Sequence, residues 1–386
     1  MWRNIASNAL TFLVVLVFLF GGVLIWAQNE YESEGPLAQA ICVQVDRGSN
    51  FRNLSEDLAA EGAVSSAVLL RIGADYAGKT SQLKAGSFLV PEGASMEQIV
   101  DIVTRGGAST CGTEVVYRVS IARATVQVRE LDPVTGRFVE IAEFNPAEDE
   151  VPAEYTEVKS EPDTRYRVSL AEGVTSWQIV QELNQIDILE GEVEEIPAEG
   201  SLAPDSYEIA PGNSRAELLQ RMESAQERIL AEAWANRQDG LPYDSPEEAM
   251  VMASIIEKET GTADERFLVS SVFVNRLEQG MRLQTDPTVI YGITRGQGVL
   301  GRGIRQSELR AETPWNTYVI DGLPPTPIAN PGRASIEAAL NPADTEFVFF
   351  VAKTLDPADG HNFAETLAEH NQNVAAYRAL EAQREN

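Results

Sequence analysis

An uninterrupted apolar segment near the N-terminus sets the first constraint on this chain. Residues 9–27 form a run of nineteen without a charged side chain. At about 1.5 Å per residue, a helix of this length spans roughly the 30 Å hydrocarbon core of a bilayer. The run is longer than the apolar part of a usual signal peptide, and no clear small-x-small cleavage site follows before Gln28. The sequence therefore predicts a transmembrane anchor at 9–27, with a cleaved signal peptide as the alternative.

The charges on either side of the apolar segment predict its orientation. Arg3 and the amino terminus precede the segment, whereas Glu30, Glu32 and Glu34 follow it. Positive charge favours the cytoplasmic side of a membrane helix. We therefore expect residues 1–8 to form a cytoplasmic tail and the long C-terminal part to lie outside the cytoplasm.

Length and charge limit the classes of fold and partner. A chain of 386 residues with 44% hydrophobic residues can bury sizeable cores, so two or three domains are expected. The formal net charge is −29, from 59 Asp and Glu against 30 Lys and Arg. Such a surface repels nucleic acid, which we do not expect as a partner.

Both cysteines follow the anchor, on the side where disulfides can persist. Cys42 and Cys111 are 69 positions apart, and the sequence does not show their separation in space, so it leaves their pairing open. Cys42 is not a lipid-attachment cysteine, because the apolar segment ends about fifteen residues before it.

A short pattern occurs three times along the chain. In each copy a strand-like segment leads to a glycine turn and a Ser or Thr able to cap, and apolar residues follow six and ten positions after the glycine. This pattern predicts a strand, a turn and an amphipathic helix packed back on the strand. Such units resemble LysM-type modules. The three copies are 45–58, 90–103 and 170–183, and the acidic segment with Gly35 and Pro36 before the first copy predicts a tether.

Residues 107–165 differ from the neighbouring segments in the pattern of their apolar and acidic residues. The segments 115–131 and 137–144 alternate apolar and polar residues around Asp132, Pro133 and Gly136, which predicts a β-hairpin. An acidic stretch, 143–161, follows and predicts a solvated linker. We interpret the region as an insertion, with a decoration that carries no chemistry as the favoured interpretation.

The C-terminal part begins with helical patterns. The segment 217–236 has helical spacing, and Ser245 with Glu248 predicts a capping box for a buried helix that ends at Gly261. Thr262 and Glu265 predict a second capping box, for a helix at 267–279. Beyond Met281 the chain is rich in glycine and proline and predicts loops, and a final helix is expected at about 363–385.

Glu257 is the carboxylate whose position favours acid chemistry. It lies in the last turn of the predicted buried helix. Burial and the negative end of the helix dipole both disfavour the ionised form of a carboxyl there. A protonated carboxyl is what glycosidic cleavage needs in a general acid. From position alone, a structural Glu257 that points to solvent beside Lys258 and Glu259 fits equally well.

The sequence offers little for other chemistries. The two histidines, His361 and His370, are too far apart for a helical zinc pair, and neither a phosphate-binding glycine loop nor a nucleophilic cysteine is evident. Carboxylate and amide chemistry remains, and we expect no metal and no cofactor.

Several motifs in fixed order resemble one known family. The segment Ala253–Thr260, which reads ASIIEKET, is similar to that of the endolytic murein transglycosylases, or YceG-like family. The resemblance covers about 45–106 and 165–380. Trp315 stands where the family commonly has Tyr, Thr326 where Gly is common, and 107–165 is additional. The other motifs that carry the resemblance are 199–207, 272–277, 281–292, 316–318, 322–325, 330–332, 360–363 and 370–371.

The resemblance implies an α+β fold with a single N-terminal transmembrane helix, a LysM-like βα subdomain and a C-terminal α+β YceG-like catalytic domain. The expected parts are a cytoplasmic tail (1–8), the transmembrane helix (9–27), a tether (28–44), a LysM-like subdomain (45–106), an inserted β-hairpin and acidic linker (107–165), a second LysM-like or connecting segment (166–213) and the catalytic domain (214–386).

The resemblance also implies a reaction. Glu257 matches the catalytic Glu of the family, which cleaves the β-1,4 bond between N-acetylmuramic acid and N-acetylglucosamine and leaves a 1,6-anhydromuramyl end without consuming water. Residues of hydrogen-bonding and stacking types are expected in the sugar cleft, with a turn as the alternative role for Asp286. These expected substrate-binding residues are Gln284, Thr285, Asp286, Tyr291, Asn316, Thr317, Tyr318 and Asn330.

Two other functions stay open at this point. One is a hydrolytic muramidase that uses Glu257 with Asp286 or Glu259, since hydrolases need a pair of carboxylates. The other is a non-catalytic glycan-binding scaffold. If the protein is a transglycosylase, as the resemblance implies, we expect a single-pass protein of the bacterial inner membrane with a periplasmic catalytic part. It would cut nascent glycan strands and terminate their elongation near peptidoglycan synthases, the penicillin-binding proteins.

Overall fold

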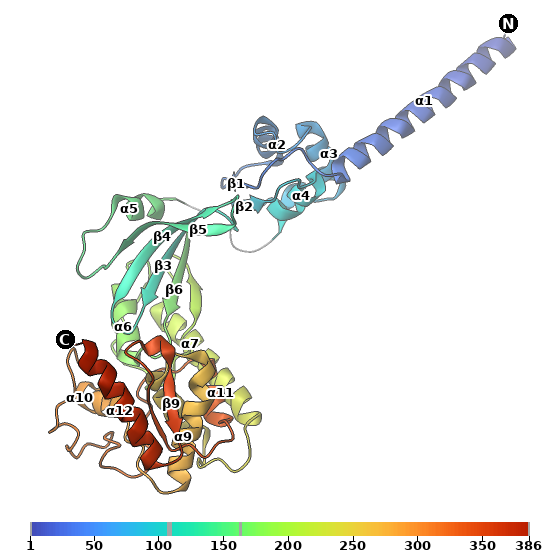
Figure 1. The fold of residues 1–386 in the computed structure, drawn as a ribbon. Coiled ribbons are helices and arrows are strands. Elements are labelled where there is room, and N and C mark those ends of the chain that lie inside the picture. The colour runs from blue at the N-terminus through green and yellow to red at the C-terminus, as the bar shows by residue number, and fades with distance from the viewer. Residues whose placement is uncertain (1, 106–109, 162–163, 385–386) are drawn as a thin grey trace. The chain divides into compact units, whose positions relative to one another are not determined.

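The computed structural model describes residues 2–105, 110–161 and 164–384. Parts of the predicted tail 1–8 and of the predicted insertion 107–165 therefore lie outside the described residues. The fold is mixed α+β, as predicted (Figure 1). Contacts divide the chain into two compact units, which we describe separately. Unit 1 comprises residues up to 115 with 127–144 and 150–165, and unit 2 comprises 116–126, 145–149 and 166 onward.

The first helix of unit 1, α1 (Trp2–Glu32), contains the predicted apolar segment. Among the described residues, its span Leu10–Glu32 is the one helix long and apolar enough to cross a membrane. None of the span is buried, and Phe18 is 77% exposed. By length and composition, α1 is thus a candidate for a single membrane span. The helix runs five residues past Ala27, so the predicted tether begins with helix.

The first two copies of the repeated pattern fold together in unit 1. Their strands pair antiparallel, with Cys42 opposite Leu89. Gly48 and Gly93 take positive φ angles of 84° and 66° in the turns, a conformation that favours glycine. The predicted apolar positions are buried in one core. The elements are β1 (Ile41–Val45), α2 (Phe51–Ala60), α3 (Ala67–Tyr76), η1 (Thr80–Gln82), β2 (Gly86–Val90) and α4 (Met96–Thr104).

Helix capping in this core follows the predicted pattern with one difference. Ser95 and Gln98 form a capping box at the start of α4. At the start of α2, however, the cap is Asn50 and not the preceding Ser49, since the Asn50 side chain accepts hydrogen bonds from the amides of Arg52 and Asn53. Asn is as good a cap as Ser, so the pattern still starts a helix.

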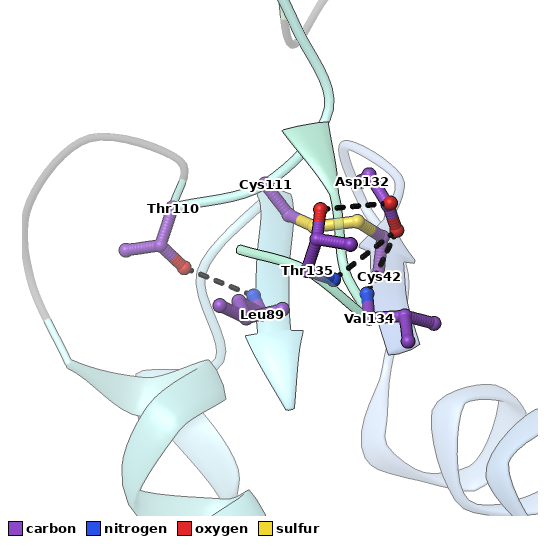
Figure 2. The surroundings of a disulfide bond; sticks show 7 residues. All are labelled: Cys42, Leu89, Thr110, Cys111, Asp132, Val134 and Thr135. Carbon is purple, nitrogen blue, oxygen red and sulfur yellow. Dashed lines mark hydrogen bonds between the residues drawn. A yellow bond between two sulfur atoms is a disulfide. The ribbon is translucent and has the colours of Figure 1, made fainter. Parts of the chain in front are cut away.

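Cys42 and Cys111 form a disulfide, which settles the pairing that the sequence left open. Their Cα atoms are 5.7 Å apart, and the bond closes a loop across 69 positions. Figure 2 shows Cys42 on β1 and Cys111 in the segment that leads to the next strand. Nearby, Thr110 Oγ1 accepts a hydrogen bond from the Leu89 amide at 3.0 Å. The disulfide thus joins the β1–β2 sheet to the chain that continues beyond it.

The predicted hairpin is present, and its first strand is broken in two. β3 (Thr113–Val119) and β4 (Ala124–Asp132) are separate strands, and β5 (Arg137–Phe144) follows the turn at Asp132. Asp132 holds this turn by accepting hydrogen bonds from the Val134 amide and the Thr135 hydroxyl (Figure 2). Apolar residues occupy odd positions from Val115 to Ile121 and even positions from Ala122 to Val128, so the alternation changes phase between the two strands. The prediction of one continuous strand overlooked this change.

The acidic stretch contains a helix where a solvated linker was predicted. α5 (Ala153–Lys159) buries Tyr155 and Val158, and the Tyr155 ring lies 5.2 Å from that of Phe144. The two apolar side chains, spaced three residues apart, share one face of the helix and pack it onto β5. Charge alone therefore gave the wrong structure for residues 153–159.

The third copy of the pattern belongs to unit 2. β6 (Arg165–Leu170) pairs antiparallel with β7 (Ser206–Ile209), and α6 (Ser176–Gln185) begins with a capping box from Thr175 and Gln178. Gly173, between them, has a φ angle of 79°. The strands belong to a five-stranded sheet in the order β5-β4-β3-β6-β7.

The rest of unit 2 is built around one buried helix. α8 (Pro246–Glu259) is apolar nearly all round, as predicted, and its residues 249–256 are buried. It contacts helices on several sides and forms the centre of the second core. The surrounding elements are α7 (Arg215–Ala235), α9 (Arg266–Glu278), α10 (Asp286–Thr294) and α11 (Arg333–Leu340).

The region beyond Met281 has more regular structure than predicted. It contains α10, α11 and a small antiparallel sheet, in addition to loops. Glycine and proline mark the ends of these short helices, which is why the segment looked irregular. The remaining elements are β8 (Phe349–Ala352), η3 (Pro357–Asp359), β9 (His361–Ala364) and α12 (Leu367–Arg384).

Candidate functional site

The C-terminal turn of α8 places Glu257 at the edge of the second core. Ser245 caps the helix by accepting a hydrogen bond from the Glu248 amide, and Pro246 occupies the first turn. Eight consecutive buried residues then carry the helix through the core. Glu257 is the first residue after this run and is only partly buried. Its carboxyl therefore lies where protein interior meets surface.

Glu257 accepts a hydrogen bond from the residue that caps the start of another helix. The Gly332 amide, at the N-cap of α11, donates to Glu257 Oε2 at 3.0 Å. An N-cap amide has no partner within its own helix, and the N-terminal end of a helix attracts negative charge. The carboxyl of Glu257 is thus held in one orientation.

A second carboxyl, from Glu172, lies against the same glycine. A Cβ atom added to Gly332 would sit 1.7 Å from Glu172 Oε1, so only glycine leaves room for it. Burial raises the pKa of Glu172, the charge of Glu257 raises it further, and Arg266 opposes both. Arg266 Nη2 lies 3.6 Å from Glu172 Oε2. Glu172 was not predicted as a site residue, although it lies in the third copy of the repeated pattern.

Lys258 points back toward the turn that carries Glu172. Its Nζ donates to the carbonyl of Gly173 at 3.2 Å. Burial lowers the pKa of Lys258, while the charges of Glu257 and Glu199 oppose that shift. The ammonium group therefore sits among carboxylates in a partly dry environment, and it fixes the β6–α6 turn on the end of α8.

Asn330 is a buried residue whose hydrogen bonds stabilise the β6–α6 turn. It is fully buried, and its Nδ2 donates to the carbonyl of Val174 at 3.1 Å and to Ser176 Oγ at 3.2 Å. Its Oδ1 accepts from the Leu202 amide at 2.9 Å. The backbone adds two more bonds, between Asn330 and residues 173 and 174. Asn330 thus positions the turn beside Glu257 through its own hydrogen bonds.

Three further predicted substrate-binding residues are also engaged inside the protein. Asn316 Nδ2 donates to the carbonyls of residues 308, 309 and 311, and its Oδ1 accepts from the Tyr318 amide. Thr317 Oγ1 accepts from the Thr285 amide at 3.0 Å. All three side chains are buried. Their geometry is that of residues that shape a loop.

Glu259 also belongs to this hydrogen-bond network. The hydroxyl of Thr285 donates a hydrogen bond to Glu259 Oε1. Burial raises the pKa of Glu259, and the hydrogen bond from Thr285 opposes that shift. Glu259 is therefore bound to the loop that begins α10.

The predicted residues that remain accessible are Gln284, Asp286, Tyr291 and Tyr318. Gln284 is exposed and has a φ angle of 48°, which is uncommon for a residue other than glycine. The hydroxyl of Tyr318 donates to Asp286 Oδ1 at 2.6 Å. Asp286 begins α10 with Pro287 behind it, so it starts a helix and does not form the turn that was weighed for it.

Tyr291 lines a cavity of about 820 Å³ with residues from several elements. Its hydroxyl donates to Glu199 Oε2 at 3.1 Å, and its ring lies 5.9 Å from that of Trp315. The Arg295 guanidinium stacks over Trp315 at 3.8 Å. Burial raises the pKa of Glu199. Glu257 does not line this cavity, but Glu199 does, and its charge acts on Lys258.

The second predicted capping box does not form. Thr262 makes no side-chain cap for the following helix, and α9 begins at Arg266. Glu265 instead accepts hydrogen bonds from the backbone amide of His361 at 2.9 Å and lies 2.9 Å from its ring Nδ1. The partner is 96 residues away in the chain, so a local pattern could not identify it.

Metal ligation is not a feature of the part of the chain that the structure describes. Across residues 2–105, 110–161 and 164–384, no group of three or more His, Cys, Asp or Glu side chains could hold a metal ion.

The structure places Glu257 beside residues that the sequence analysis had not assigned to the site. Glu257 lies with Gly332, Lys258 and Glu172, whereas Gln284, Asp286 and Tyr318 belong to the neighbouring α10 region. Glu172 and Glu199 were missed as site residues. Both nevertheless lie in motifs that the sequence analysis identified. Glu172 lies in the third copy of the repeated pattern, and Glu199 begins segment 199–207.

Comparison with known proteins gives consistent matches. The model of the YceG-like family matches residues 43–376. An endolytic murein transglycosylase of Bacillus subtilis is 34% identical over 181 residues, 47% of this chain and 48% of the relative. One of Streptococcus pneumoniae is 24% identical across 97% of this chain and 66% of the relative. The chain thus spans about half to two thirds of these relatives.

A crystal structure of a YceG-like protein from Listeria monocytogenes is similar to this chain, with a TM-score of 0.46 and 24% identity. The match covers 86% of this chain and 98% of the Listeria chain. The family model alone matches well over half of the residues. The chain therefore belongs to the YceG-like family.

Proposed function

We propose that this protein is an endolytic peptidoglycan lytic transglycosylase. It would cleave the β-1,4 bond between N-acetylmuramic acid and N-acetylglucosamine and leave 1,6-anhydromuramyl ends, as a carbon–oxygen lyase does. The observation that carries the proposal is Glu257, which is partly buried and oriented by the Gly332 amide. It lies within residues 43–376, which the family model matches, and in the segment 253–260 that resembles the family. The names of the relatives support the same reaction class.

In the proposed mechanism Glu257 acts twice. As an acid, its carboxyl gives a proton to the glycosidic oxygen, and the bond to C1 of the muramyl sugar breaks. As a base, the resulting carboxylate takes the proton of the muramyl C6 hydroxyl, whose oxygen bonds to C1. The proton balance closes and no water is consumed. The hydrogen bond from Gly332 supports the second step, because it stabilises and orients the carboxylate.

The hydrolytic alternative gains little support from the geometry. It would need a second carboxylate to activate water, and Asp286 and Glu259 were the candidates. Asp286 accepts a hydrogen bond from Tyr318, and Glu259 accepts one from Thr285. Both carboxyls are engaged in the α10 region. We therefore keep the transglycosylase as the proposed function.

We propose two roles for the residues predicted to bind substrate. Gln284, Asp286, Tyr291 and Tyr318 would contact the glycan, since they are exposed or partly exposed. The aromatic wall of Tyr291 and Trp315 would support a sugar ring by stacking. The buried members would act by holding their loops in place. These are Thr285, Asn316, Thr317 and Asn330.

For the organisation of the chain, we propose that residues 45–106 form a LysM-like subdomain and 214–386 a catalytic domain. Segment 166–213 would connect them, and 107–165 would be an insertion. The strand, glycine turn and helix of each copy support the LysM-like interpretation. The third copy contributes Glu172 next to Glu257, so it would serve the catalytic domain directly.

We also propose that α1 anchors the protein in the bacterial inner membrane with the catalytic part in the periplasm. A disulfide in unit 1 supports an oxidising compartment. A tethered site would reach glycan strands as they emerge, so it would terminate their elongation close to peptidoglycan synthases such as penicillin-binding proteins.

Mass spectrometry of cell-wall digests tests the reaction. The full chain in detergent should release products with anhydromuramyl ends. A Glu257→Gln variant should lose at least about a hundredfold in rate, since general acid–base catalysis contributes on that scale. The exposed Glu227 offers the matched control, Glu227→Gln, which should keep full rate. Reducing ends would indicate a muramidase, and no release a scaffold.

A complementation experiment tests the role of the anchor. Cells that lack the protein would receive either the full chain or a secreted form without residues 1–28. We expect only the full chain to restore normal glycan length. Equal complementation by both forms would reject the proposal that tethering matters.

A further inference from the structure

We propose that Arg295, which lies over the ring of Trp315, is a specificity-determining residue that binds a carboxylate on the side arm of the muramyl sugar. The inference deepens the proposed function and rests on it for the identity of the ligand. N-acetylmuramic acid differs from N-acetylglucosamine by a lactyl ether, whose carboxyl is free or is linked to a peptide with carboxylates of its own. An anion site would therefore distinguish the two sugars of the strand.

The first observation is the backbone conformation of Arg295. The residue follows the last turn of α10 with a φ angle of 56° and a ψ angle of 33°, in the left-handed region. Glycine or asparagine is usual where a helix ends in this way, because other side chains are strained there. A strained residue at the edge of a cavity points to a role for its side chain.

The second observation is the support beneath the guanidinium. The Cζ atom of Arg295 lies 3.8 Å from the centre of the Trp315 ring. Tryptophan is the aromatic residue that attracts a cation most strongly. The ring is itself fixed, because its Nε1 donates a hydrogen bond to Thr326 Oγ1 at 3.0 Å. The guanidinium thus rests on a platform that holds one orientation.

Trp315 and Thr326 are the two single residues at which the sequence departs from the pattern common in its family. The hydrogen bond between them joins the two departures in one structure. A tyrosine at position 315 would lack the indole N–H, and a glycine at position 326 would lack the hydroxyl that accepts it. Together with Arg295, the two residues form a unit that is particular to this chain.

The third observation is that the Arg295 side chain has no partner except the ring. In the part of the chain that the structure describes, no hydrogen bond or ion pair engages its guanidinium. A guanidinium that lies over a ring keeps the N–H donors at its edge available. Such a planar fork binds a carboxylate through two parallel hydrogen bonds. The free donors therefore favour a carboxylate as the ligand.

The cavity of about 820 Å³ gives the ligand room. Arg295, Trp315 and Tyr291 all line it, and Arg295 is the one cation among the described residues that do. The volume is within the range of pockets that enclose small ligands. Because Arg295 lies over Trp315, a sugar against the wall of Tyr291 and Trp315 has its side arm within reach of the guanidinium.

Three carboxylates line the same cavity and limit where an anion can bind. They are Glu199, Glu247 and Glu248. Two of them are occupied by the protein, since Glu199 Oε2 accepts from the Tyr291 hydroxyl and Glu248 Oε2 accepts from the Asp244 amide at 2.7 Å. Like charges disfavour an anion near these groups. The anionic arm of a bound sugar is therefore directed to Arg295.

A binding titration that needs no catalysis tests the proposal. The full chain in detergent, with ¹⁵N-labelled tryptophan, would be titrated with two pairs of probes. One pair is N-acetylmuramic acid and its methyl ester, and the other is N-acetylmuramyl-L-alanyl-D-isoglutamine and its methyl ester. The indole signal of Trp315, assigned by its loss in Trp315→Tyr, reports binding. In at least one pair, the acid should bind about tenfold more tightly than the ester, as expected for a charge-assisted hydrogen bond.

Substitutions of Arg295 separate recognition from folding. Asparagine tolerates the left-handed backbone, so Arg295→Asn should unfold at a temperature no lower than the wild type. In this variant the acid and the ester should bind equally. Arg295→Lys keeps the charge without the fork and should recover part of the difference. The control is Arg378→Asn, which replaces an exposed arginine of α12 outside the cavity and should keep the full difference.

The two pairs of probes also distinguish the source of the carboxylate. A difference in the N-acetylmuramic acid pair assigns the ligand to the lactyl group, and a difference only in the dipeptide pair assigns it to the peptide. A difference below about twofold in both pairs would overturn the proposal, as would one that persists in Arg295→Asn. If the wild type released no anhydro ends, the proposed function would fail, yet this titration would still decide whether Arg295 selects a muramyl carboxylate.

Discussion

The amide of Gly332 lies 3.0 Å from Oε2 of Glu257 and donates a hydrogen bond to it, at the point where the end of one helix meets the start of another. The arrangement uses the first amide of α11 to orient the carboxyl at the end of α8. It requires a glycine, because the carboxyl of Glu172 occupies the place of a side chain. One backbone position thus links the proposed acid with the carboxyl beside it.

Replacement of Gly332 by alanine tests this link. The new methyl group must displace Glu172, whose carboxyl is the end of a flexible side chain, so we expect a cost in stability below about 1 kcal/mol. Activity should nevertheless fall, because the added methyl group disturbs the site at which the Gly332 amide orients the Glu257 carboxyl. Gly261→Ala is the control, since nothing lies within 4 Å of its added Cβ. Equal activity of the two variants would contradict the expectation.

Asn330→Ala should destabilise unit 2 through lost hydrogen bonds. The change leaves the Leu202 amide and the carbonyl of Val174 without their side-chain partner in a buried place. A cost of about 2–3 kcal/mol is expected for such groups. Chemical denaturation of the full chain would measure it. Asn236→Ala removes an exposed side-chain bond at the end of α7 and should cost less than about 1 kcal/mol.

Glu265 should make stability depend on pH. Burial alone would raise its pKa, but hydrogen bonds from His361 and its charge, with that of Lys353, lower it below the ordinary 4.5. Because the folded pKa lies below the unfolded one, the contribution is complete above pH 4.5 and is lost as the pH falls through the folded value.

The substitution Glu265→Gln tests that sign. The variant should be less stable than the wild type by about 1–2 kcal/mol at pH 7, and the two should converge in acid as wild-type Glu265 protonates. Unfolding measured from neutral pH to pH 3 would show the convergence. The exposed neighbour Asp264 supplies the control, Asp264→Asn, for which the difference should be small throughout.

The disulfide should contribute strongly to the stability of unit 1. Closing a loop across 69 positions restricts the unfolded chain, and the entropic estimate for that length is about 4 kcal/mol. Reductant should therefore lower the Tm of the wild type. A Cys42→Ser and Cys111→Ser double variant should have a lower Tm than the wild type without reductant, and its Tm should not change when reductant is added. A wild-type Tm that did not respond to complete reduction would refute the expectation.

Much of the secondary structure follows from local pattern. The strand, glycine turn and helix of the repeated segments were predicted because a two-residue period changes to a helical one at a glycine. The buried helix α8 and its cap at Ser245 were predicted for the same kind of reason. The helix α5 was missed, because only two apolar side chains pack it against Phe144 and its neighbours are charged.

The site was less accessible to sequence reasoning, because its contacts join distant segments. Glu265 had the spacing of a capping box, yet its partner is His361. Asn316 and Asn330 have side chains of the type that binds sugars, but both side chains form hydrogen bonds with backbone groups of the protein itself. Glu172 had a visible motif, but its closeness to Glu257 depends on how the β6–α6 turn packs on α8.

The order of the five-stranded sheet has an evolutionary consequence. β3 lies next to β6, and the Ala171 amide, one residue before Glu172, is bonded to Val119 at the end of β3. A change of length at the tip of the β4–β5 hairpin would not alter the register of β3 against β6. A residue gained or lost within β3, by contrast, would change its register against β6 and shift the turn that follows. Selection that preserves the turn beside Glu257 should therefore also preserve the length of β3, which lies outside the predicted catalytic domain.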